Sequence, residues 1–149
     1  MGIAKALRET NARLYSAAVE PTESPVMKGG AAGPHSIEGI GDGFVPAIVK
    51  DAGGALSSEI SEVIHVNSED AMGASMYLAQ NFGYCVGVSS GANFLAAREL
   101  SHKHRTVVTI LPDGFTRYVS IGLHSSDRCP FHGEACRLHR KTMATPGRS

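Results

Sequence analysis

The stretch Val86-Gly87-Val88-Ser89-Ser90-Gly91-Ala92-Asn93 leads from an apolar segment through two hydroxyl side chains into a segment with helical spacing. Residues 84–88 predict a strand, and residues 91–101 predict a helix whose apolar side chains share one face. In an open α/β sheet, the carboxyl ends of the strands and the N-termini of the helices form the ligand crevice. The stretch therefore predicts a binding edge that contains Ser89 or Ser90. The alternative is that one of these serines only caps the helix.

The same alternation of strand and helix continues on both sides of this stretch. A helical spacing begins after a cap, Asn67 or Ser68, and runs to residue 82, where Gly83 is suited to end it. Residues 106–111 are β-branched and apolar, as in a strand buried on both faces. Further elements are a helix-like stretch at 3–9, a short apolar segment at 14–19 and a strand at 63–66. This alternation predicts an α/β fold with a parallel sheet and flanking helices.

Composition excludes several classes of function. The 149 residues carry 14 basic and 14 acidic side chains, whereas a nucleic-acid-binding protein normally has a basic excess. No apolar run in the sequence is long enough to cross a bilayer. The odd number of cysteines, three, argues against a disulfide framework and for a reducing compartment. We therefore expect a cytoplasmic protein that acts on a small molecule, with a polar tail at 124–149.

Two further segments are candidates for the same binding edge. Gly39-Ile40-Gly41-Asp42-Gly43-Phe44 alternates glycines, which permit positive φ and let a flat ligand approach the backbone. It lacks the third glycine of a dinucleotide-binding fingerprint, and an ordinary tight turn is the alternative. Leu111-Pro112-Asp113-Gly114 follows the predicted strand at 106–111 and should share the carboxyl edge with Ser89, although Pro-Asp-Gly is also common turn chemistry.

Cysteine and histidine alternate in the polar tail. Cys129, His132, Cys136 and His139 supply two sulfur and two nitrogen ligands, the number that a tetrahedral zinc site needs. Only three residues separate the two pairs, which is far fewer than in zinc-finger patterns. We therefore expect no obligatory metal site there.

Taken in order, these segments resemble one family. The matching stretches are Val19-Glu20-Pro21, residues 35–46, Asp70-Ala71-Met72, residues 86–93, residues 107–113 and Arg117-Tyr118-Val119-Ser120. They resemble the C-terminal portion of the cysteine synthases (O-acetylserine sulfhydrylases) and of the related cystathionine β-synthases. The resemblance covers residues 3–123, about half of a usual family member. It implies that residues 1–123 are the C-terminal part of a catalytic region that depends on pyridoxal 5'-phosphate.

The resemblance implies a fold, a reaction and a set of site residues. The fold would be part of the tryptophan-synthase-β-like fold of the type II pyridoxal-phosphate enzymes. The reaction would be β-replacement, in which O-acetylserine and sulfide give cysteine and acetate, carried out in the full family by a homodimer. Ser89 matches the residue at the ring nitrogen of the cofactor, and Pro112 and Asp113 match a loop close to that end of the ring. The residues that match the substrate cleft are Gly39, Ile40 and Gly41.

The sequence also departs from the family pattern. Asp42 stands where alanine is common, and Gly114-Phe115-Thr116 replaces Ser-Gly-Glu. The family's Schiff-base lysine and phosphate loop lie upstream of the matching region, and the lysines of this chain stand in unrelated contexts: Lys5, Lys28, Lys50, Lys103 and Lys141. We therefore expect the catalytic lysine on a missing N-terminal half. Two alternatives stay open, a cystathionine β-synthase-like reaction and a non-catalytic binding or partner subunit that retains the fold.

Overall fold

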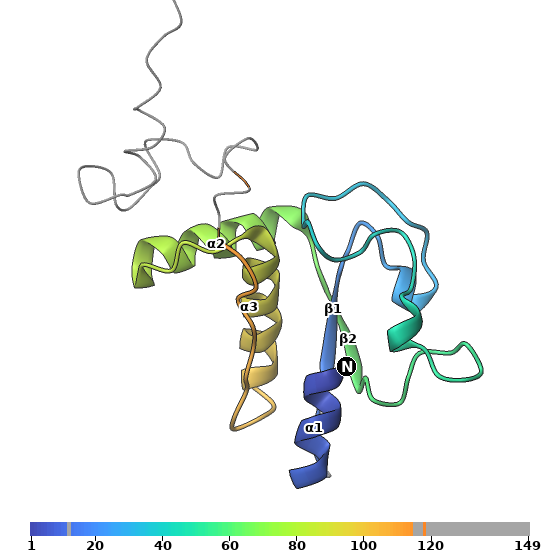
Figure 1. Ribbon diagram of the computed structural model, residues 1–149. Coiled ribbons are helices and arrows are strands. Elements are labelled where there is room, and N and C mark those ends of the chain that lie inside the picture. Colours follow the sequence, from blue (N-terminus) through green and yellow to red (C-terminus); the bar gives the residue numbers. More distant parts are fainter. Residues whose placement is uncertain (12, 115–117, 119–149) are drawn as a thin grey trace, which may run out of the picture.

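The computed structural model describes residues 1–11, 13–114 and 118. In chain order, its elements are α1 (Gly2–Thr10), β1 (Ala17–Pro21), η1 (Val26–Lys28), η2 (Ala47–Val49), β2 (Glu62–Val66), α2 (Ser68–Phe82) and α3 (Val88–Ser101). Figure 1 shows the two strands side by side, with α2 and α3 on one side and the short helices η1 and η2 on the other. No helix in this described part is both long and apolar enough to cross a membrane.

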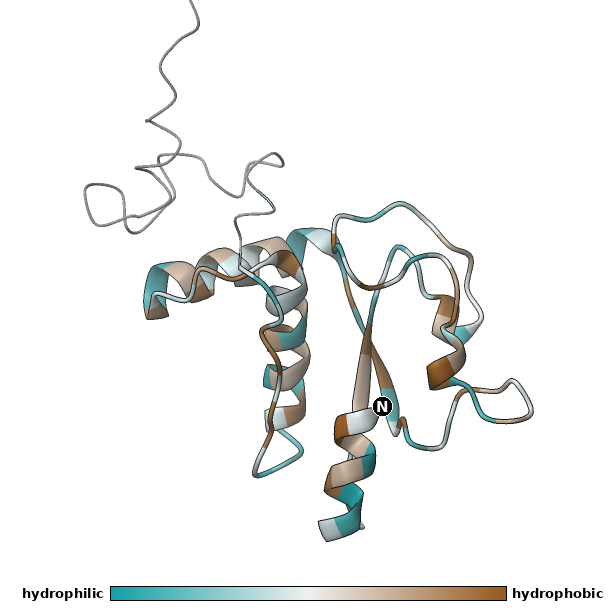
Figure 2. Cartoon of the chain, in the orientation of Figure 1, coloured by the Kyte–Doolittle hydropathy of each residue, from teal (hydrophilic) through white to brown (hydrophobic). Residues whose placement is uncertain are grey.

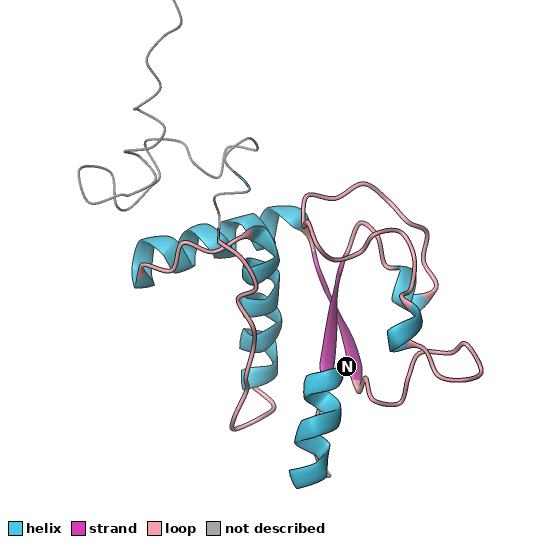
Figure 3. Ribbon diagram, in the orientation of Figure 1, coloured by secondary structure: helices cyan, strands magenta, loops and turns pink. Residues whose placement is uncertain are grey.

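The sheet confirms the predicted parallel arrangement. β1 and β2 pair in parallel, in a register that runs from Ala17 opposite Glu62 to Pro21 opposite Val66. Parallel strands require a crossover connection, which is usually an α-helix. Here residues 22–61 make the crossover, and Figure 3 shows them as loops interrupted only by η1 and η2. The crossover therefore runs mostly as loop from the end of β1 to the start of β2.

The core lies between the sheet, α2 and α3. Figure 2 shows apolar residues along both strands and along the part of α3 that runs beside them. Ile64 and Val66 of β2 pack in one buried cluster with Ala92 and Ala96 of α3. The two helices approach so closely at Gly91 that a Cβ there would lie 2.0 Å from the carbonyl oxygen of Ala71. The N-terminal end of α3 thus packs closely against α2.

The predicted boundaries of α2 are confirmed. The Asn67 side chain accepts a hydrogen bond from the backbone N–H of Asp70 at 2.7 Å, as an N-cap should. Glu69 and Asp70 place negative charge in the first turn, where it stabilises the helix dipole. Gly83 ends the helix in the left-handed conformation, with φ of 75°.

Two predicted strands are absent. α3 already begins at Val88, so residues 84–88 form no strand and contribute only a single bridge between Val86 and Gly114. Residues 106–111 also lack strand structure, and Val108 is 86% exposed. A strand exists only through a backbone partner, and the described residues offer none to this segment. It runs beside α3 instead, where the Asn93 side chain donates to the carbonyl of Ile110 at 2.9 Å.

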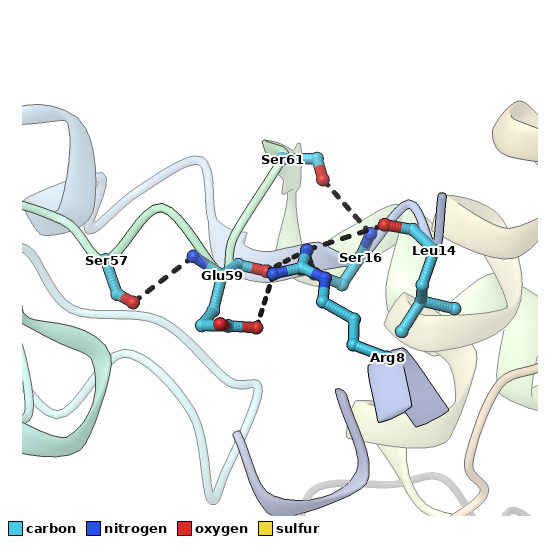
Figure 4. A network of polar contacts seen from close by, with 6 residues as sticks. All are labelled: Arg8, Leu14, Ser16, Ser57, Glu59 and Ser61. Carbon is cyan, nitrogen blue, oxygen red and sulfur yellow. Dashed lines mark hydrogen bonds and ion pairs between the residues drawn. The ribbon is translucent and has the colours of Figure 1, made fainter. Parts of the chain in front are cut away.

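A polar network attaches α1 to the start of both strands (Figure 4). Arg8 forms an ion pair with the Glu59 carboxylate and donates to the Glu59 carbonyl at 3.0 Å. The same guanidinium donates to the carbonyl of Leu14 at 3.4 Å, and the Ser16 hydroxyl donates to the Glu59 carbonyl. Arginine can serve several acceptors because its donors point in fixed, divergent directions. The predicted helix at 3–9 is therefore confirmed and is fastened to the segment that precedes β2.

Candidate functional site

The structure brings together two of the predicted site residues, Ser89 and Asp113. Ser89 lies in the first turn of α3 and is 5% exposed. Its hydroxyl donates to Asp113 Oδ1 at 3.3 Å. The loop that carries Asp113 is held in place because the Gly87 amide donates to the Asp113 carbonyl at 3.0 Å. Pro112 precedes Asp113 in the same loop and is exposed.

The serines do not cap α3, so the capping alternative is wrong. The N-cap residue is Gly87, and no side chain makes a capping hydrogen bond. Ser90 is fully buried, and its hydroxyl oxygen has no hydrogen-bond partner within the described residues. The first backbone N–H groups of α3 therefore have no side-chain cap, and uncapped N–H groups at a helix N-terminus are suited to bind a ligand.

Tyr118 completes this cluster and was not assigned a role from the sequence. Its side chain is 1% exposed, and its hydroxyl donates to Asp113 Oδ2 at 3.0 Å. Burial, together with the hydrogen bond to Asp113 and the negative charge of that carboxylate, raises the pKa of Tyr118. The phenol therefore stays protonated and keeps donating to Asp113. The only sequence signal was its place in the stretch that ends the family resemblance.

The predicted glycine segment forms a turn at the carboxyl end of β1. Gly39, Gly41 and Gly43 all have positive φ, which confirms the reason for the alternating glycines. At Gly41 a side chain would also collide with the Pro21 ring, since a Cβ there would lie 2.6 Å from Pro21 Cδ. Ile40, between the first two glycines, packs against the buried cluster that contains Val88. The turn and the Ser89 region therefore share one core.

Two acidic residues anchor the loop that carries this turn. The sequence did not predict that either of them would hold the loop in place. Glu20, at the end of β1, is fully buried; its Oε2 accepts from the Met27 amide at 2.8 Å, and its Oε1 pairs with His65 Nε2 at 3.0 Å. Glu23 Oε1 accepts from the Ser68 amide at 2.7 Å. Burial raises the pKa of Glu23, but the hydrogen bonds from Ser68 and from its own amide outweigh that effect and hold the pKa below its usual range.

The described lysines lie on elements other than the Ser89 region. Lys5 is in α1, Lys28 is in η1, and Lys50 follows η2. Lys103 lies beyond the opposite end of α3, about 20 Å along the helix from Ser89. Its ammonium group is paired with Glu62 at 3.7 Å and with Glu99 at 3.8 Å.

Comparison with known proteins identifies the family. Residues 1–113 match the pyridoxal-phosphate dependent enzyme family, and the chain belongs to it. Over 131 residues the chain is 40% identical to a cysteine synthase of Staphylococcus aureus, a match that covers 85% of this chain and 40% of that enzyme. The chain therefore spans about two fifths of the length of the curated relatives it matches.

Solved structures agree with this assignment. An O-acetylserine sulfhydrylase, isoform 3, of Entamoeba histolytica superimposes with a TM-score of 0.75 at 35% identity, covering 83% of this chain and 36% of that one. An O-acetylserine dependent cystathionine β-synthase of Helicobacter pylori gives a TM-score of 0.73 at 35% identity, covering 83% of this chain and 39% of that one. The chain thus adopts part of the type II fold of pyridoxal-phosphate enzymes, as its sequence predicted.

The residues present fit one end of that cofactor. A pyridine nitrogen needs a single hydrogen-bond donor, and the buried Ser89 hydroxyl would provide it by turning its one proton from Asp113 to the ring, while Tyr118 continues to donate to Asp113. No group of three or more metal-ligating side chains is placed to hold a metal ion among the described residues. The predictions about the tail at 124–149, including Cys129, His132, Cys136 and His139, fall outside those residues.

Proposed function

We propose that this chain is the C-terminal, cofactor-facing part of a pyridoxal-phosphate-dependent cysteine synthase. In the proposed reaction O-acetylserine loses acetate from its β-carbon and sulfide takes its place, giving cysteine. The observation that carries the proposal is the contact between Ser89 and Asp113, because two segments matched to the cofactor ring meet at the N-terminus of α3. The identity to cysteine synthases over most of the chain supports the same reading.

Each part of the site has a role in this proposal. Pyridoxal phosphate, when bound, withdraws electrons from the substrate carbon. Ser89 would orient the cofactor ring through a hydrogen bond to the ring nitrogen. Pro112 and Asp113 would form the loop that lies close to the same end of the ring. Gly39, Ile40 and Gly41 would line the substrate cleft, where a backbone without side chains lets a small amino acid approach closely. The amine that bonds to the cofactor would come from a lysine outside the described region.

A second candidate reaction is favoured by one of the structural comparisons. The Helicobacter pylori protein is an O-acetylserine dependent cystathionine β-synthase and is as similar in sequence as the sulfhydrylase. Replacing sulfide with homocysteine as the second substrate would distinguish the two reactions. A third candidate, a non-catalytic partner subunit, is favoured because the described lysines lie on elements other than the N-terminal end of α3 or, for Lys103, beyond its opposite end.

The test joins this chain to the N-terminal part of the Staphylococcus aureus cysteine synthase that lies outside the match. In the joined protein, Ser89→Ala is expected to lower cysteine formation about 100-fold, because one preorganised hydrogen bond to the reacting system is lost. Cofactor retention should change little, because the phosphate and lysine anchors lie elsewhere. Turnover is measured with O-acetylserine and sulfide, and retention by the cofactor absorbance after gel filtration.

Ser90→Ala is the matched control, because it removes a neighbouring buried hydroxyl that has no partner in the described structure. Its turnover is expected to stay within about twofold of the unchanged protein. A normal rate in Ser89→Ala together with a large loss in Ser90→Ala would mean that Ser90, and not Ser89, contacts the cofactor ring. A joined protein that binds the cofactor but forms neither cysteine nor cystathionine would favour the partner-subunit candidate.

A further inference from the structure

The carbonyl of Gly41 is the most heavily hydrogen-bonded group of the glycine turn. His35 Nε2 lies 2.9 Å from this oxygen, the Gly43 amide 2.7 Å and the Ser24 hydroxyl 3.3 Å. A carbonyl oxygen has two lone pairs, so three donors leave it no capacity for water or substrate. Ser24 is fully buried, so this arrangement is built into the loop and does not depend on surface side chains.

The contact determines which nitrogen of His35 carries the proton. A carbonyl oxygen only accepts hydrogen bonds, so Nε2 must be the donor. The other nitrogen, Nδ1, is buried and has no hydrogen-bond partner within the described residues. Neutral His35 is therefore the tautomer with hydrogen on Nε2.

The turn is enclosed between the imidazole and a proline. A Cβ on Gly41 would lie 3.0 Å from His35 Nε2 and 2.6 Å from Pro21 Cδ, and Gly41 itself has φ of 69°. Pro21 is the last residue of β1 and pairs with Val66, so one of the residues that confine Gly41 belongs to the sheet. His35 also confines Gly41, and its removal would take away one of the three hydrogen bonds to the Gly41 carbonyl.

We propose that His35 is a positioning residue, which fixes the Gly39–Gly41 turn of the substrate cleft by donating its Nε2 proton to the carbonyl of Gly41. The proposal rests on the proposed function for the role of the cleft. The hydrogen bond and its tautomer are properties of this chain alone and are tested without cofactor.

The first experiment uses the full chain, isotopically labelled, in solution. The ¹⁵N resonances of His35 should show hydrogen on Nε2 and not on Nδ1. His35→Asn, whose amide is too short to reach Gly41, should accelerate hydrogen exchange of the Gly43 amide about tenfold, the factor for one typical net hydrogen bond. His35→Gln, which places an N–H near the position of Nε2, should stay within about twofold. His102→Gln is the control, since His102 is exposed at the end of α3.

The second experiment uses the protein joined to the Staphylococcus aureus N-terminal part. His35→Asn should raise KM for O-acetylserine about tenfold with a smaller change in kcat, and His35→Gln should restore KM. A ring without hydrogen on Nε2, an unaltered Gly43 exchange rate in His35→Asn, or an unchanged KM would overturn the proposal. A joined protein without activity would contradict the proposed function only, because the solution measurements would still decide whether His35 holds the turn.

Discussion

Gly91→Ala is expected to lower the free energy of unfolding by about 3 kcal/mol, a large part of the stability of a domain of this size. The added Cβ would lie 2.0 Å from the Ala71 carbonyl oxygen and 2.8 Å from the Ser75 nitrogen. Both atoms belong to the backbone of α2, so no side chain can rotate away to make room. α2 and α3 would have to move apart, which loosens the core cluster. Urea unfolding followed by helical circular dichroism measures the loss.

Gly73→Ala is the matched control, because it makes the same substitution inside α2. No atom lies within 4 Å of a Cβ at that position. Alanine favours the helix over glycine, so this variant is expected to gain about 0.5–1 kcal/mol of stability. If Gly91→Ala unfolds at the same urea concentration as the unchanged chain, the close contact between α2 and α3 is not present in solution.

Residues 1–149 on their own are expected to form no detectable cysteine from O-acetylserine, sulfide and pyridoxal phosphate. The reaction needs an amine held over the cofactor, and none of the described lysines lies at the N-terminal end of α3, where Ser89 is. Holding reacting groups in the right geometry corresponds to an effective concentration on the order of 10⁵ M or more, so an unpositioned lysine forfeits most of the rate. Turnover should appear when the Staphylococcus aureus N-terminal part, expressed separately or joined, is supplied. Cysteine is measured directly as product.

The control for this experiment replaces each lysine of the chain singly with arginine, which keeps the positive charge but forms no covalent bond with the cofactor. The changed positions are Lys5, Lys28, Lys50, Lys103 and Lys141. In the joined protein all five variants should retain activity. Turnover by the chain alone that one of these changes abolishes would contradict the expectation and reveal a catalytic lysine within it.

Local signals in the sequence predicted local structure correctly. The cap at Asn67, the terminal Gly83 and the positive φ of the glycine turn were all expected from a few neighbouring residues. The strand expected at 106–111 is absent because its β-branched composition describes a suitable strand but supplies no partner for its backbone. Strand pairing is a property of distant segments: the sequence predicted a parallel sheet but not that β1 pairs with β2.

In the candidate site too, the sequence predicted some contacts and not others. The meeting of Ser89 and Asp113 was expected because both were placed at the carboxyl edge of the sheet. Two anchors of the loop that carries the glycine turn were not expected, because Glu20 and Glu23 act through contacts with backbone groups that no spacing rule connects to them. Such residues carry no local signature, since any acidic side chain in a loop has the same appearance in the sequence. A role for His35 in ordering the glycine segment was expected only from its place at the start of that segment.

The two-stranded sheet has a consequence for the behaviour of the protein at high concentration. In the described structure β1 and β2 pair only with each other, so each strand presents one row of unpaired N–H and C=O groups. Unpaired strand edges are templates on which another chain can add a strand. We therefore expect the isolated chain to self-associate as its concentration rises, and the joined protein to do so much less. Light scattering across a dilution series would show the difference, and a monomer at all concentrations would mean that these edges are shielded.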